Sequence, residues 1–500
     1  MRLVRLGIDT HQEPIVYMRE ESPVCRSEGF EAQTRVEVKT GTHTIVATLN
    51  FVRGDTLGED VLSVGEAGLS EAAWRRLGSP DGEPARIRHA PPVESLGFVR
   101  SKIYGHRLSE ANFRAILRDI VDGDFADVHL AAFLTACGGD RLDNGEVASL
   151  TRAMREVGET IEWDFEPVVD KHCVGGLPGN RTTPIIVAIV AEYGLPIPKT
   201  SSRAITSPAG TADTMEVMAP VNLSIHDIRR VVERECGCVA WGGAVRLSPA
   251  DDTLIRVERA LDLDSEGQLV ASVLSKKAAA GSTHVVIDMP VGPTAKVRSE
   301  RAADRLEELL EVAAEAVGLE IRIVRTDGRQ PVGRGIGPAL EARDVVAVLQ
   351  RSAEAPQDLA NRATTLAGEI IALAEERDSE EAVEIAREIL ESGRAWEKFQ
   401  RIRRAQGGIR EIPDSAHQKD VAAQVSGRLT RIDNRKIAQL AKLAGAPEAP
   451  AAGVEIHARL DDAIEVGEPL LTIHTETPGE RDYALDYLQE HRESLMQVES

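Results

Sequence analysis

The pattern of apolar and polar positions divides the chain into four stretches of different character. Residues 1–90 contain short runs rich in β-branched side chains, such as 35–39 and 44–48. They end in a Gly- and Pro-rich stretch, 78–92, that is typical of a linker. These features predict a small β-rich domain over residues 1–90.

Apolar residues recur at helical spacing from about residue 94 onward. Ala111–Asp122, Ala126–Cys137 and Asn144–Val157 each carry such a stripe, and a glycine follows each of them. The pattern predicts a helical domain over residues 94–165. Charged, amphipathic helix returns over 356–404, and we expect it to complete this helical unit.

Strand-like and helix-like segments alternate from residue 166. This alternation predicts a mixed, largely parallel sheet flanked by helices over residues 166–415. Two short strands and a charged helix predict a small α+β domain over 416–500. The expected fold class is therefore α/β, with a helical domain and small N- and C-terminal domains. The expected strands are 167–170, 283–289 and 319–325, and the expected helices are 184–193, 299–317 and 340–352.

Composition narrows the classes of partner. The formal net charge is −22, and no cluster of Lys and Arg outweighs its acidic neighbours, so we expect no nucleic-acid polymer and no membrane partner. The first 18 residues lack the apolar core of a signal peptide, and the longest apolar run, Ile185–Ala191, is far shorter than a membrane span.

The five cysteines are an odd number at irregular spacing. This usage is typical of a reduced, cytoplasmic protein. Cys236 and Cys238 could bind a metal, but no second pair stands at ligand spacing, so we expect no metal site.

A first candidate loop, Asp170–Thr183, follows a strand and leads into a helix. Its three glycines let backbone N–H groups converge on an anion, and the helix N-terminus adds a positive dipole. Lys171 adds a full charge, while Thr182 and Thr183 add hydroxyl donors. The bland alternative is an ordinary strand-to-helix turn capped by threonine.

A second loop, Thr200–Glu216, gathers hydroxyl side chains and one arginine around the start of another helix. Capping and solvation alone could explain these residues. In an open α/β sheet, however, both loops share the carboxyl edge, where ligands bind. The two loops together predict an anion site.

Particular residues in these loops resemble a known family. Asp170-Lys-His with Gly175-Gly176, and Ser201-Ser-Arg-Ala-Ile with Gly210-Thr-Ala-Asp213, resemble the thymidine/pyrimidine-nucleoside phosphorylase family. The resemblance covers roughly residues 94–500. The N-terminal domain and Ser202–Ser207 resemble the longer subgroup, which includes AMP phosphorylase and putative thymidine phosphorylases.

The resemblance implies roles for individual residues. Cys173 stands where the shorter enzymes place a phosphate-binding serine, and a thiol donates only weakly. The implied phosphate-binding residues are Lys171, Thr182, Ser201 and Thr211. The implied substrate-binding residues are Gly176, Ser202, Arg203, Ala204, Ile205, Thr206, Ser207, Thr211, Ser272, Lys276 and Lys296.

Two residues are candidate acids. The resemblance implies Asp264 as the donor to a purine leaving group, which requires burial to raise its pKa. For a pyrimidine, His172 is the better candidate because the ordinary pKa of histidine lies near neutrality. A solvated helix edge is the alternative for Asp264, Lys276 and Lys277, and a structural role is the alternative for His172. The Arg of the pyrimidine enzymes aligns with Val257, although Arg256 and Arg259 are close by.

The resemblance implies phosphorolysis of an N-glycosidic bond in a nucleoside 5′-monophosphate or nucleoside, giving free base and a pentose 1-phosphate. Thymidine phosphorylase is the alternative; a magnesium-dependent phosphoribosyltransferase and a non-catalytic ligand-binding protein rank below. Inorganic phosphate is a co-substrate, and we expect no cofactor. The helical unit resembles the family's dimerisation domain and predicts a homodimer or larger homo-oligomer.

Overall fold

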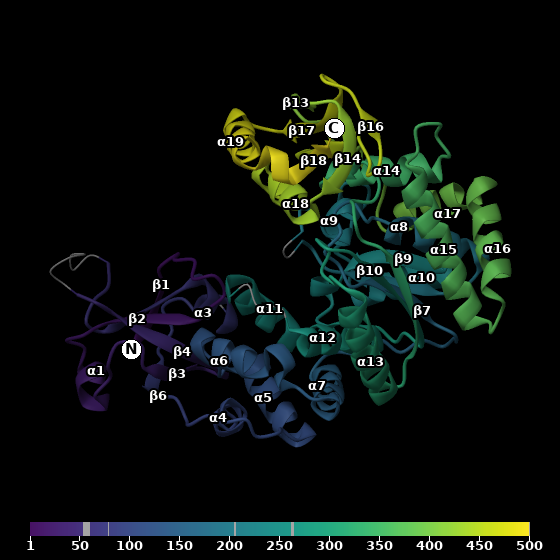
Figure 1. The fold of residues 1–500 in the computed structure, drawn as a ribbon. Coiled ribbons are helices and arrows are strands. Elements are labelled where there is room, and N and C mark those ends of the chain that lie inside the picture. The colour runs from purple at the N-terminus through teal and green to yellow at the C-terminus, as the bar shows by residue number, and fades with distance from the viewer. Residues whose placement is uncertain (54–60, 79, 205–206, 262–264, 500) are drawn as a thin grey trace. The chain divides into compact units, whose positions relative to one another are not determined.

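The chain forms two compact units in a computed structural model (Figure 1). One comprises Met1–Glu146 with Pro249–Ser265, and the other Val147–Ser248 with Glu266–Ser500. The structure describes residues 1–53, 61–78, 80–204, 207–261 and 265–499. Within those ranges, every helix is too short or too polar to cross a membrane.

The N-terminal part of the first unit is a six-stranded sheet in the order β1-β5-β2-β4-β3-β6. Leu3, Val16, Leu49 and Leu69 are fully buried in its core. The expected β-rich domain is present, but residues 78–92 are not only a linker, because they supply β6, which pairs with β3. The elements are β1 (Arg2–Arg5), β2 (Ile15–Arg19), α1 (Pro23–Glu28), β3 (Arg35–Thr40), β4 (His43–Val52), β5 (Glu66–Leu69), α3 (Glu71–Arg76) and β6 (Arg86–His89).

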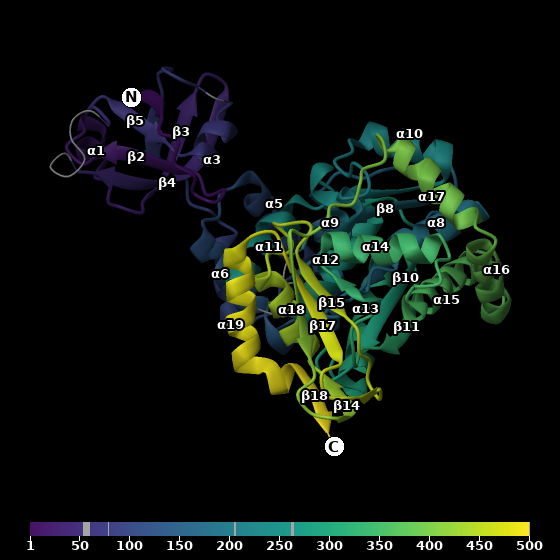
Figure 2. The ribbon, with the colours of Figure 1, turned by 90° about the horizontal axis from the view of Figure 1, so that it is seen from above.

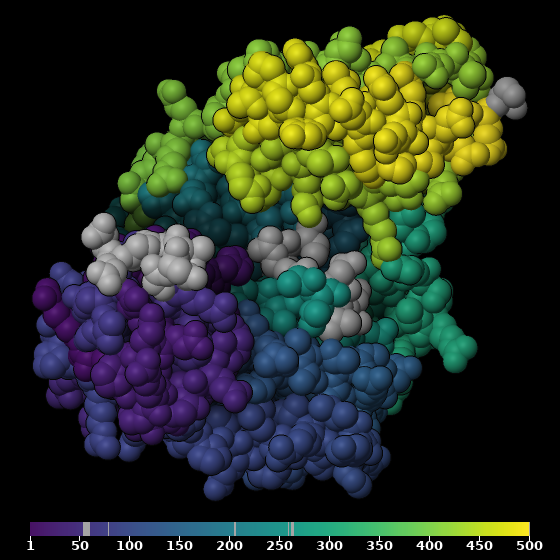
Figure 3. All heavy atoms as spheres, turned by 90° about the vertical axis from the view of Figure 1, so that its left-hand side faces the viewer, coloured from purple at the N-terminus to yellow at the C-terminus, as the bar shows by residue number. Residues whose placement is uncertain are grey.

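Helices follow the sheet in the same unit. The Arg35 guanidinium joins the two parts by donating to the carbonyl oxygens of Gly123 and Asp124. Figure 3 shows the purple sheet residues and the blue helical residues forming one continuous surface. The elements are α4 (Leu96–Ile103), α5 (Glu110–Asp122), α6 (Asp127–Cys137), η1 (Gly139–Arg141), α7 (Asn144–Glu156), which runs on into the second unit, and α11 (Pro249–Leu261).

The helix that completes this unit differs from the one expected. α11 packs against α5 and α6. Residues 356–404 instead form α15 (Gln357–Ala374), α16 (Ser379–Glu391) and α17 (Arg394–Ala405), which pack against α8 (Thr183–Tyr193) of the second unit. The prediction for 356–404 was wrong because an amphipathic stripe indicates a buried face but not which partner buries it.

Parallel strands form the centre of the second unit (Figure 2). β7 (Val169–Cys173), β10 (His284–Val291) and β11 (Glu320–Asp327) pair in the order β11-β10-β7, and β8 (Ile197–Ser201) pairs with β9 (Gly237–Trp241). All these pairings are parallel, and β7 lies beside β8. The carboxyl ends of the strands therefore lie at one edge, as the sequence predicts.

Helices cover this sheet. α8 is apolar on all sides, and Ile185 to Ala191 are all buried, which suits a helix enclosed between the strands and α15–α17. The other elements are α9 (Thr211–Glu216), α10 (Ile225–Glu235), η2 (Gly242–Ala244), α12 (Glu266–Ala279), α13 (Glu300–Val317), β12 (Gly335–Ile336) and α14 (Pro338–Leu349).

The C-terminal part joins the α/β part through a shared sheet. β12 pairs with β15, which brings Gly335 opposite Glu455. Two small antiparallel sheets, β12-β15-β17-β13 and β16-β14-β18, pack with two helices around a separate apolar core. The elements are β13 (His417–Ala422), β14 (Gly427–Ile432), α18 (Asn434–Leu443), β15 (Gly453–Ile456), β16 (Ala463–Ile464), β17 (Pro469–Thr475), α19 (Pro478–Leu495) and β18 (Met496–Glu499).

A buried ion pair stabilises the helical unit, and its removal should be costly. Lys102 Nζ lies 2.7 Å from both Glu146 carboxylate oxygens, and each side chain is 4% exposed. We predict that Lys102→Met destabilises this unit by about 3–5 kcal/mol, because Glu146 is left charged and unpaired. Arg107→Ala, which breaks the exposed neighbouring pair with Asp143, should change little. Urea unfolding followed by circular dichroism compares the two; equal effects would contradict the prediction.

Candidate active site

Lys171 is the central residue of β7, and its side chain is 1% exposed. Its Nζ donates to Thr182 Oγ1 at 3.0 Å and lies 3.6 Å from Asp288 Oδ2. Thr182 is fully buried at the start of α8. The structure thus brings together two of the residues expected to bind phosphate.

Asp288, on β10, fixes the position of the ammonium group. Its carboxylate also accepts from Asn180 Nδ2 at 2.9 Å and from Thr326 Oγ1 at 2.7 Å. Burial opposes ionisation of this carboxyl, but the Lys171 charge and the hydrogen bonds prevail and hold its pKa below the usual range. The anionic form of Asp288 therefore places a negative charge 3.6 Å from Lys171 Nζ inside the protein.

Asp170, on β7, contacts two further buried lysines. Lys277 Nζ donates to Asp170 Oδ2 at 2.7 Å, and Lys199 Nζ lies 3.3 Å from Asp170 Oδ1. Lys199 is on β8, so its contact with Asp170 links β8 to β7; its Nζ also donates to the carbonyl oxygen of Thr200, on β8 itself, at 2.8 Å. Lys277 is 3% exposed, so the alternative of a solvated helix edge is wrong for this residue.

The two residues that follow Lys171 are held neutral. Burial lowers the pKa of His172 well below its ordinary value, and the nearby lysines, Lys277 first among them, lower it further. Burial raises the pKa of the Cys173 thiol to about 12, and Asp288 adds to the effect. A neutral imidazole and a neutral thiol therefore stand beside the cationic Lys171.

The second loop begins where β8 ends. Ser201 Oγ is buried and has no hydrogen-bond partner among the described residues. Thr211 opens α9, and Asp213 in the same turn accepts from the backbone N–H groups of Ala204 and Gly210 at 2.7 and 2.9 Å. Asp213 thereby closes the loop between Ser201 and Thr211 on itself.

Arg203 has its charge balanced within this loop. Its NH1 lies 3.1 Å from Asp213 Oδ1 and 2.5 Å from Glu216 Oε2. Its guanidinium carbon lies 4.9 Å from the centre of the Trp241 ring. Two carboxylates and an aromatic face leave Arg203 little charge to offer a substrate anion.

Gly176 brings the first loop against Lys296. It has a φ of +78°, and a Cβ atom there would lie 2.4 Å from the backbone nitrogen of Lys296. Only glycine tolerates both the left-handed backbone and this close approach. Two expected substrate-binding residues are therefore neighbours.

The remaining expected substrate residues fall into two sets. Ser272 and Lys276 are half-buried, four residues apart on α12, on a helix whose neighbouring positions are mostly buried. Ser202 and Ser207 are exposed, and Ala204 is half-buried. Ile205, Thr206 and Asp264 lie outside the described residues.

The arginine expected near Val257 is otherwise engaged. Val257 is buried on α11, and Arg256 forms an ion pair with Asp127 of α6 at 2.5 Å. Both residues lie within the first unit. Arg256 is thus committed to holding α11 against α6.

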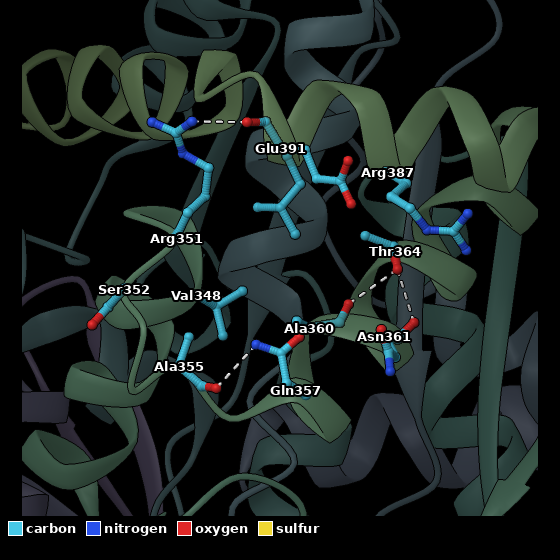
Figure 4. A pocket seen from close by; sticks show the side chains of 11 residues that line it. Val348, Arg351, Ser352, Ala355, Gln357, Ala360, Asn361, Thr364, Arg387 and Glu391 are labelled. Carbon is cyan, nitrogen blue, oxygen red and sulfur yellow. Dashed lines mark hydrogen bonds between the residues drawn. The ribbon is translucent and has the colours of Figure 1, made fainter.

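A hollow of about 170 Å³ lies elsewhere in the second unit (Figure 4). Its lining comes from the end of α14, from α15 and from α16, and includes Arg351, Asn361 and Arg387. The two loops contribute no residue to it. We therefore assign this hollow no role in the candidate active site.

Sequence reasoning missed several residues that shape the loops. Asp288 could have been noticed as a charged residue within an otherwise apolar strand, 284–291, and Lys277 as a charge in an apolar helix. Arg181 and Glu341 pair at 2.5 Å, but they lie 160 positions apart in the sequence, so no local pattern indicated the pair.

The chain is similar to known proteins along most of its length. Family models match at residues 97–158 (glycosyl transferase family, helical bundle domain), 166–396 (glycosyl transferase family, a/b domain) and 428–494 (pyrimidine nucleoside phosphorylase C-terminal domain). A "Putative thymidine phosphorylase" of a Polaromonas species is 60% identical over 100% of this chain and 97% of its own length. One from Hahella chejuensis is 56% identical over 98% and 96%.

Solved structures share the fold at lower identity. Anthranilate phosphoribosyltransferase from Thermus thermophilus is 21% identical with a TM-score of 0.50, covering 62% of this chain and 98% of that one. The enzyme from Saccharomyces cerevisiae is 14% identical with a TM-score of 0.52, covering 63% and 98%. The full-length relatives and the three family models show that the chain belongs to the thymidine/pyrimidine-nucleoside phosphorylase family.

Proposed function

We propose that this protein is a pentosyltransferase that cleaves the N-glycosidic bond of a nucleoside with inorganic phosphate. The observation that carries the proposal lies near the edge where β7 and the neighbouring β8 end: Lys171 donates to Thr182 there, and among the described residues the buried Ser201 hydroxyl has no hydrogen-bond partner. Such an edge suits an anion, because buried cations and hydroxyl donors replace its hydration shell.

In the proposed reaction, a phosphate oxygen attacks C1′ as the C1′–N bond breaks. The products are a pentose 1-phosphate and the base, which takes a proton as it leaves. Lys171 and the hydroxyl donors hold the phosphate beneath C1′, and the phosphate charge stabilises the cationic sugar of the transition state. Ser272 and Lys276 of α12 contact the base in this proposal.

The proton donor depends on the base. We assign Asp264 to a purine and His172 to a pyrimidine. His172 is neutral in the free protein, since burial and the nearby lysines lower its pKa. A bound phosphate dianion next to Lys171 would favour the imidazolium form and so raise that pKa, which prepares His172 to donate when phosphate is present.

Thymidine is the substrate that we favour. The relatives that match over the full length are named for thymidine phosphorylase. A 5′-phosphate would need a second anion site, and Arg203 and Lys296 are cationic residues among the expected substrate-binding set. Because Asp213 and Glu216 balance the charge of Arg203, that second site loses much of its attraction.

A nucleoside 5′-monophosphate such as AMP is the second candidate. Val257 occupies the position of the pyrimidine enzymes' arginine, and the guanidinium of its neighbour Arg256 is paired with Asp127. The Ser202–Ser207 segment also resembles that of AMP phosphorylase.

We further propose that the enzyme acts in the cytoplasm as a homodimer or larger homo-oligomer and needs no metal or other cofactor. Five free cysteines suit a reducing compartment. Activity that is lost in EDTA and restored by magnesium would contradict the metal-free reaction.

If Lys171 binds phosphate, its replacement should weaken the kinetics for phosphate specifically. Lys171→Ala should lower kcat/KM for phosphate, and the lost transition-state stabilisation should be about 2–4 kcal/mol, because a charge-assisted contact in a buried site is removed. Thr211→Ala should cost less, since only a neutral hydroxyl is lost. Lys442→Ala, at an exposed position on α18, is the control. Unchanged phosphate kinetics in Lys171→Ala would place the anion site elsewhere.

Base identity should separate the two acids. With thymidine and AMP as substrates, His172→Asn should impair thymidine cleavage, and Asp264→Asn should impair AMP cleavage, since an amide cannot deliver the proton. We expect a higher kcat/KM for thymidine than for AMP in the wild type, with base release in both cases requiring phosphate. A higher value for AMP, abolished by Asp264→Asn, would favour the nucleotide instead, and equal release without phosphate would indicate a hydrolase.

A further inference from the structure

Arg181 joins three segments of the second unit at one point. Its Nε donates to Glu341 Oε2 at 2.5 Å, NH1 to Thr211 Oγ1 at 2.6 Å and NH2 to the carbonyl oxygen of Ala209 at 2.9 Å. The side chain is 11% exposed. One guanidinium therefore connects the first loop, the second loop and α14.

The partner of this guanidinium is itself fixed. Glu341 is 1% exposed near the start of α14, and its carboxylate also accepts from Thr214 Oγ1 at 3.0 Å and from the backbone nitrogen of Gly337 at 3.4 Å. A buried carboxylate with these bonds holds the planar fork of Arg181 in one orientation. Since Glu341 balances its charge, Arg181 acts by geometry more than by net charge.

The bond to Thr211 has a consequence for hydrogen bonding. A hydroxyl has one hydrogen and two lone pairs. Arg181 fills a lone pair of Thr211 Oγ1, and among the described residues the hydroxyl hydrogen has no recorded acceptor. That hydrogen is therefore free to be donated to a ligand.

We propose that Arg181 is a positioning residue that, held by Glu341, turns the Thr211 hydroxyl into a donor for the phosphate oxygen. A separate bond, from Arg181 NH2 to the carbonyl oxygen of Ala209, holds the second loop against the first. This inference rests on the proposed function, because the phosphate is the acceptor that it supplies. Arg181 itself needs no contact with phosphate in this arrangement.

The test is a double-mutant cycle between Arg181→Lys and Thr211→Ala. Lysine keeps a positive charge for Glu341 but cannot make three bonds in a fork. Arg181→Lys should weaken kcat/KM for phosphate by about 100-fold, the scale of a small misplacement in a reacting site, with KM for the nucleoside unchanged. In the Thr211→Ala background the same change should add little, because Arg181 acts through Thr211.

The Kd for inorganic phosphate, measured by calorimetry in the same four proteins, separates this inference from the proposed function. Non-additive Kd values without any turnover would support the positioning role and refute the phosphorylase. Additive effects, or Arg181→Lys equal to the wild type, would overturn the positioning role. Arg343→Gln, on α14 but paired with exposed Asp414, is the control and should bind phosphate normally. If Arg181→Lys does not fold, Glu341→Gln replaces it in the cycle with the same expectations.

Discussion

The buried ion pair between Lys171 and Asp288 is the interaction on which the candidate site depends. Burying an ammonium group at 1% exposure is costly unless a carboxylate compensates for its lost hydration, and Asp288 does so from the neighbouring strand. The register that places β7 beside β10 sets this pairing, with Asp288 opposite Cys173. Sheet geometry therefore decides where the positive charge lies.

The second loop depends on backbone closure in the same way. Asp213 gathers the N–H groups of Ala204 and Gly210, and a Cβ atom at Gly210 would lie 2.5 Å from the carbonyl carbon of Arg203. Asp213 thus holds the two described ends of the loop, one after Ser201 and one before Thr211, close together. Such pre-organisation reduces the entropy lost when an anion binds.

Local patterns predicted the elements well, and distant partners escaped them. Helix 111–122 appears as α5 (Glu110–Asp122), because its apolar stripe and the following glycine are both local signals. The motif residues Lys171 and Thr182 meet as expected. By contrast, nothing near 356–404 indicates that these helices pack on α8, and the ion pair between Arg181 and Glu341 joins residues that only the fold brings together. The apolar pattern of a segment predicts its secondary structure but not the distant segment that packs against it.

The most direct test of the central claim is a crystal structure of the protein grown with inorganic phosphate. The account predicts one phosphate within hydrogen-bonding distance of Lys171 Nζ and of the Ser201 and Thr211 hydroxyls, at the carboxyl edge of β7 and β8. Phosphate bound only at another place, with this edge filled by water at saturating concentration, would contradict it.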